Sequence, residues 1–185
     1  RSTRFPDAGP AARALLLAAL LLPLPRLAAE EPSPIDPAAR AIEFRPSKYE
    51  GFPRCVEVRE AAPRLRAQAI AALRERLGIA YEDRGTIKLR FQDLAAEGES
   101  VPEPRMAERI TETVDGAETA VVVVYWEHVM TGVADPLEEI THEFLHAIHR
   151  ERVPREAYLA VPRWVREGLA LHGAGQGPGR IRYLL

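Results

Sequence analysis

The sequence predicts an α+β fold in which a small mixed or antiparallel sheet packs on a histidine-bearing helix that is followed by a second helix. Residues 86–92 alternate between apolar and polar side chains, as a half-buried strand does. Residues 120–126, AVVVVYW, form an apolar run typical of a buried strand. Residues 135–152 and 162–173 combine helical apolar spacing with start and stop signals. A chain of 185 residues with 46% hydrophobic residues can build one domain with a real core.

The first 29 residues have the pattern of a secretory signal peptide. Arg13 precedes an apolar run at 14–24, and small residues end the segment at Ala29. As a helix the apolar run is about 16 Å long, whereas a membrane core is about 30 Å thick. We therefore expect cleavage near Ala29, export to the periplasm or the medium, and no stable membrane span after cleavage. An uncleaved short anchor is the alternative.

Four prolines in residues 30–48 predict an extended leader, with order beginning near Tyr49. The folded domain is then expected at 49–185, truncated at its C-terminus. Residues 54–59 alternate around two valines and predict a strand.

Pro63 suits the first turn of a helix, and Gly78 is well placed to end it. Residues 95–105 are polar and interrupted by prolines, so a loop is expected there. Asp115-Gly116 is a strong hairpin signal before the apolar run, although residues 109–114 fit more than one kind of element.

The next helix is predicted to begin with Asp135 as its cap and to end near Arg152. Within it, His142-Glu143-Phe144-Leu145-His146 places two histidines about 6 Å apart along one helix face. Both imidazoles can then reach one metal ion. The glutamate between them is positioned to take a proton from a metal-bound water.

A catalytic zinc site uses three protein ligands and keeps one position open for water. His149 lies about 10.5 Å along the axis from His142, too far to share a tetrahedral ion. A third histidine six residues after His146 is excluded because Arg152 stands there. The remaining candidate is Glu167, on the helix expected at 162–173.

HEFLH followed by WVREGLA is similar to the gluzincin metallopeptidases, and the WxxEGxA form resembles their aminopeptidase-like and peptidase MA-like branches. The resemblance covers residues 135–173, roughly a fifth of the chain. It implies His142, His146 and Glu167 as zinc ligands and Glu143 as catalytic base, in an incomplete gluzincin-like catalytic domain. The tyrosine or histidine that stabilises the oxyanion in such enzymes is not identified, with Tyr158 and Tyr183 as candidates.

These expectations describe a hydrolase that cleaves a peptide or protein substrate. A zinc ion held by two imidazoles and one carboxylate lowers the pKa of its bound water to about 7 and polarises a carbonyl. Zinc is chosen over cobalt or manganese from ligand type and availability, since affinity alone favours copper. Glu143 would move the proton to the leaving amine.

Several neighbours of the motif have expected roles of their own. By the resemblance, the strand at 120–126 borders the cleft, so Tyr125 and Trp126 could line it; core packing is the alternative. Trp164 is expected to pack the second helix on the first. His149 is expected to interact with the C-terminal helix dipole. Glu139 could anchor a ligand histidine.

The remaining features exclude other kinds of protein. A net charge of −2 argues against a dedicated nucleic-acid surface. Cys55 is the only cysteine, so neither an internal disulfide nor a cysteine-based metal site is expected. The main alternative function is a secreted, non-catalytic module that binds a metal or recognises a partner.

Overall fold

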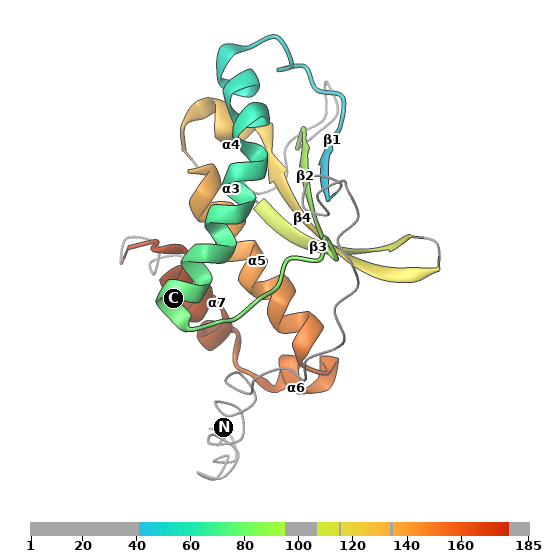
Figure 1. Cartoon of the computed structure of the whole chain (residues 1–185), viewed down its shortest axis with the longest axis vertical. Coiled ribbons are helices and arrows are strands. Elements are labelled where there is room, and N and C mark those ends of the chain that lie inside the picture. Colours follow the sequence, from blue (N-terminus) through green and yellow to red (C-terminus); the bar gives the residue numbers. More distant parts are fainter. Residues whose placement is uncertain (1–40, 95–106, 115, 134, 178–185) are drawn as a thin grey trace, which may run out of the picture.

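The computed structural model describes residues 41–94, 107–114, 116–133 and 135–177. These residues form an α+β fold with a four-stranded mixed sheet and five helices (Figure 1). The α+β class predicted from the sequence is therefore confirmed. The elements in chain order are β1 (Ile42–Phe44), α3 (Pro53–Leu77), β2 (Ile87–Gln92), β3 (Ala107–Val114), β4 (Ala117–Tyr125), α4 (Trp126–Thr131), α5 (Pro136–Arg152), α6 (Arg155–Ala160) and α7 (Arg163–Ala174).

The sheet has the order β1-β2-β4-β3, so β4 is an internal strand and β3 an edge. β1, β2 and β4 run parallel, and β3 pairs antiparallel with β4. Leu89 lies opposite Val122, and both belong to the main core. Val121 and Val123 belong to a smaller cluster instead, because alternate residues of a strand point to opposite faces. The strand that the resemblance places at the border of the cleft is β4, and it is an internal strand with β2 and β3 on its two sides.

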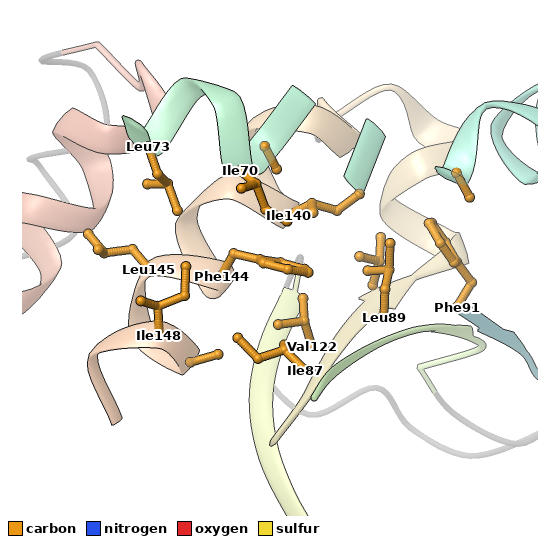
Figure 2. Close-up of a cluster of buried hydrophobic side chains, with 14 of the residues drawn as sticks. Ile70, Leu73, Ile87, Leu89, Phe91, Val122, Ile140, Phe144, Leu145 and Ile148 are labelled. Carbon is orange, nitrogen blue, oxygen red and sulfur yellow. The ribbon is translucent and has the colours of Figure 1, made fainter. Parts of the chain in front are cut away.

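The main core lies between the sheet and the helices α3 and α5 (Figure 2). α5 contacts the sheet on one side and α3 on another, which explains why its residues are buried around much of its circumference. α7 in turn packs against both α3 and α5. The core residues labelled in Figure 2 are Ile70, Leu73, Ile87, Leu89, Phe91, Val122, Ile140, Phe144, Leu145 and Ile148.

Ordered structure begins before the expected Tyr49. β1 lies inside the range 30–48 that was predicted to be an extended leader, and it pairs with β2. Ser47 follows it and donates a hydrogen bond from Oγ to Asp93 Oδ1 at 2.6 Å. A strand as short as β1 gives little sequence signal of its own. It is stabilised by pairing with β2, which is distant in the chain. The segments 1–29 and 30–40 lie outside the described residues.

The strand predicted at 54–59 is wrong, because these residues form the first turns of α3. Cys55, Val58 and Ala62 are buried on one side of this helix. Spacings of three and four residues fit a helical stripe, although the valines alone also fit a strand. Pro63 therefore lies inside the helix rather than at its start, while Gly78 ends it in the left-handed conformation as predicted (φ 67°).

The predicted hairpin is confirmed. β3 and β4 pair from Val114↔Ala117 to Ala107↔Val124, and Gly116 in the turn has φ 81°. Trp126 begins α4 instead of ending the strand. The loop expected at 95–105 lies outside the described residues.

The predicted bounds of α5 are confirmed. Asp135 Oδ1 accepts hydrogen bonds from the backbone N–H groups of Leu137 (2.8 Å) and Glu138 (3.4 Å). The short helix α6 lies between α5 and α7 in the chain. Gly173 was expected to end α7, but the helix continues to Gly175 (φ 75°). Among the described residues, no helix combines the length and the apolar character that a membrane crossing requires.

Candidate metal centre

Three side chains from α5 and α7 converge at one point. His142 and His146 lie one turn apart on α5, and Glu167 comes from the first half of α7, which packs against α5. The two imidazole Nε2 atoms are 3.2 Å apart. Glu167 Oε2 lies 3.3 Å from His142 Nε2 and 3.4 Å from His146 Nε2. The three residues predicted as metal ligands are thus brought together.

The spacing of these atoms fits a tetrahedral metal ion. Zinc bonds to nitrogen and oxygen are about 2.0–2.1 Å long, so neighbouring ligand atoms at the tetrahedral angle lie about 3.3 Å apart. The three separations of 3.2, 3.3 and 3.4 Å match this value. Nitrogen and carboxylate oxygen are also the donor types that zinc accepts. His142, His146 and Glu167 can therefore hold a metal ion.

The charges of the site reinforce one another. Hydrogen bonds from His142 and His146 hold the pKa of Glu167 well below its ordinary value, against the effect of burial. Burial lowers the pKa of His142, but the hydrogen bond to Glu167 and the charges of Glu143 and Glu167 outweigh it and raise that pKa. Both shifts favour positive charge between the imidazoles and the Glu167 carboxylate.

Glu143 lies on the same helix and is in a different environment. Burial raises its pKa, and the nearby charges of His146 and His142 oppose this effect. Glu143 is absent from the group whose ligand atoms converge. Glu143 nevertheless interacts electrostatically with all three converging side chains.

Tyr158 of α6 lies behind His146. Its hydroxyl is 3.5 Å from His146 Nδ1, the ring nitrogen on the far side from Glu167, and the residue is only 7% exposed. Arg166 lies over the Tyr158 ring, with its guanidinium carbon 4.5 Å from the centroid. The Tyr158 hydroxyl thus lies on the side of His146 that faces away from Glu167, and this position does not support the oxyanion role considered for it. Tyr183 lies outside the described residues.

A second residue, Gln176, lies behind His142 and was missed by sequence reasoning. Its Oε1 is 3.1 Å from His142 Nδ1, and its Nε2 donates to Glu139 Oε1 at 2.9 Å. Glu139 was considered as a direct anchor for a histidine, but it reaches His142 through Gln176. No local sequence pattern links Gln176 to a residue 34 positions earlier.

Two expectations about α7 and α5 are wrong. Trp164 does not pack α7 on α5, because it is 69% exposed, and the buried residues of α7 lie at its C-terminal end. His149 is buried with its ring 5.1 Å from that of Tyr158, and burial lowers its pKa. A lowered pKa disfavours the cationic imidazole that an interaction with the helix dipole requires.

Tyr125 and Trp126 do not line an accessible cleft. Trp126 is fully buried in the main core, with its ring centroid 5.1 Å from that of Phe91. Tyr125 is 4% exposed on the opposite face of the sheet, where its hydroxyl donates to Glu108. The core alternative considered for both residues is the one observed.

Neither a scan against protein-family models nor searches of the curated proteins and of the solved structures found a match. The likeness to gluzincins is therefore a resemblance of motifs over 135–173. A function for this chain has to be inferred from the side chains of the site and from these motifs.

Proposed function

We propose that the chain is a zinc-dependent hydrolase that cleaves peptide bonds. The observation that carries this proposal is the convergence of His142, His146 and Glu167 at separations that suit a tetrahedral ion. Three protein ligands are the number that catalytic zinc sites use, whereas structural sites use four. The peptide as substrate class comes from the resemblance of HEFLH and WVREGLA to gluzincin metallopeptidases.

Each residue of the site has a role in this proposal. A bound zinc ion would supply Lewis acidity toward a carbonyl and acidify a water molecule. Glu143 accepts the proton of that water and delivers it to the leaving amine. Burial raises the pKa of Glu143, which makes its carboxylate a stronger base than an exposed glutamate. His142 and His146 would hold the ion through ring nitrogens, and Glu167 would hold it through a carboxylate oxygen that contributes one negative charge.

Export of the protein is part of the same proposal. It rests on the signal-peptide pattern of residues 1–29.

The proposal is tested with three variants of α5. Elemental analysis of the purified protein should find one zinc ion per chain. Glu143→Ala should retain the zinc and lose about 10²–10⁴-fold in the rate of peptide cleavage, as expected when a general base is removed. His142→Ala should lose the zinc. Glu151→Ala, an exposed glutamate on the same helix, should behave like the wild type.

Cleavage is measured on a broad peptide library with and without a chelator. Cleavage that persists in Glu143→Ala and His142→Ala and resists the chelator would contradict the proposal. Stoichiometric zinc without cleavage of any peptide would instead favour the non-catalytic metal-binding module.

A further inference from the structure

Gln176 connects a carboxylate to a ligand histidine within the protein interior. The residue is 7% exposed and Glu139 is 4% exposed. Its side-chain amide bridges Glu139 Oε1 at 2.9 Å and His142 Nδ1 at 3.1 Å. The three side chains come from one face of α5 and from the turn that follows α7.

The carboxylate determines which way the amide points. A carboxylate only accepts hydrogen bonds, so the NH₂ group of Gln176 must face Glu139. The amide oxygen must then face His142, where it can only accept. His142 Nδ1 therefore carries a proton and donates it to Gln176.

This proton on Nδ1 decides which nitrogen of His142 is free for a metal. A neutral imidazole carries one proton, which can sit on either nitrogen, and only the other nitrogen has a lone pair to donate. With the proton held on Nδ1, the lone pair lies on Nε2. Nε2 is the atom that lies 3.2 Å from His146 Nε2 and 3.3 Å from Glu167 Oε2.

The backbone after α7 is shaped to place Gln176. Gly175 adopts the left-handed conformation (φ 75°), and the N–H of Gln176 donates to Leu171 O at 2.9 Å. Arg76 of α3 donates from Nη1 to Gly173 O at 3.0 Å. A side chain at Gly175 would collide with the Arg76 guanidinium, so glycine is required there both for conformation and for space.

We propose that Gln176, oriented by Glu139, is a positioning residue that holds His142 in the tautomer able to bind zinc through Nε2. The inference rests on the proposed zinc site and extends it to a residue outside the sequence motifs. A partner on the second nitrogen of a ligand histidine typically changes metal affinity by about 10–100-fold. Gln176 supplies that partner through an amide whose direction is fixed.

The test replaces the amide with an apolar side chain of similar length. Gln176→Met should weaken zinc binding by about 10–100-fold in competition with a chelator of known affinity. Gln68→Met is the matched control, because Gln68 is exposed on α3, and it should bind zinc as the wild type does. The melting temperature of each zinc-free protein separates a loss of stability from a loss of affinity.

A second readout reports on the tautomer itself. In the zinc-loaded protein labelled with ¹⁵N-histidine, the Nδ1–H proton of His142 should be protected from exchange with water. That protection should be lost in Gln176→Met and kept in Gln68→Met.

Equal zinc affinity in wild type and Gln176→Met, or a protected Nδ1–H in both, overturns this inference while leaving the zinc site intact. A wild-type chain that binds no zinc overturns both proposals.

Discussion

The two carboxylates of the site are in opposite electrostatic environments. Hydrogen bonds from two imidazoles hold the pKa of Glu167 low, whereas burial raises the pKa of Glu143. Carboxylates whose pKa values are separated in this way commonly divide the tasks of charge stabilisation and proton transfer. Glu167 also has a second neighbour, because Arg163 Nε lies 3.8 Å from its Oε1, although Arg163 is largely exposed. Oε2 is the oxygen that faces the two histidines, so it is the carboxylate oxygen placed to bind a metal, while Oε1 lies toward Arg163.

Replacing Glu167 tests whether its carboxylate binds the metal and acts on His142. Glu167→Gln keeps the size of the side chain but removes its negative charge, so zinc should bind more weakly than to the wild type. The same change removes the negative charge and replaces a charge-assisted hydrogen bond with a neutral one, and the original charge and hydrogen bond both raise the pKa of His142 in the metal-free protein. That pKa should therefore fall, as measured by NMR titration.

Glu156→Gln, at an exposed position of α6, serves as the control and should leave both quantities unchanged. An unaltered His142 titration in Glu167→Gln would show that the carboxylate does not act on the imidazole.

At the residue scale, the sequence can predict how side chains are arranged where a single helix determines their positions. His142 and His146 share a face of α5 because they are four residues apart, and this follows from helix geometry alone. Glu167 could be named because it lies on a second predicted helix, in a stretch (WVREGLA) that resembles a gluzincin motif. Gln176 could not, because its approach to His142 depends on the turn at Gly175 and on tertiary packing. The burial of Trp164 was wrongly expected because apolarity does not tell which face of a helix is covered.

At the scale of elements, the place of α7 depends on its contact with α3. A Cβ atom at Gly173 would lie 2.9 Å from Leu73 Cδ2 and from Leu77 Cδ1, so the two helices approach closely because this residue is glycine. Both Glu167 and Gln176 are positioned by α7 or by the turn that ends it. The close approach of these helices therefore helps to assemble the metal centre.

The same substitution at two glycines of α7 separates packing from helix propensity. Gly173→Val should destabilise the protein by about 1–3 kcal/mol, because added methyl groups overpack the contact with Leu73 and Leu77. Gly168→Val should change stability by less than about 0.5 kcal/mol, since Gly168 has open space around it and valine is tolerated in helices. Urea unfolding of both variants measures the difference. Equal stabilities would mean that α7 does not pack on α3 through Gly173.

The elements also show why local signals misplaced the start of α3. Proline is a common first residue of helices, so Pro63 suggested that the helix begins there, and residues 54–59 were assigned to a strand. Pro53 is the proline that begins the helix, and the stripe Cys55, Val58 and Ala62 continues past Pro63 to Ala69. Burial along a continuous helical face outweighed the lost hydrogen bond of one internal proline.

At the scale of the whole molecule, ion pairs connect segments that are distant in the chain. Arg66 is fully buried on α3 and makes two hydrogen bonds of 2.6 Å to Asp83, in the segment that leads to β2. Its guanidinium carbon also lies 5.0 Å from the ring centroid of Phe144 on α5. On the other face of the sheet, Arg90 pairs with Glu43 of β1 and Glu112 of β3. The α+β class followed from patterns, but these long-range pairs and the parallel strand order did not.

A metal ion at the candidate centre would act on this whole assembly, because its ligands come from two helices that both pack on α3. A ligand that binds only the folded state stabilises it by about 2.7 kcal/mol when its free concentration is 100 times its dissociation constant. We therefore expect zinc to raise the free energy of unfolding by about this amount at that concentration, and a chelator to reverse the change. His142→Ala should be insensitive to both additions. Urea unfolding of the two proteins, each with zinc and with chelator, measures these effects, and equal responses to zinc in wild type and His142→Ala would place the stabilising ion elsewhere.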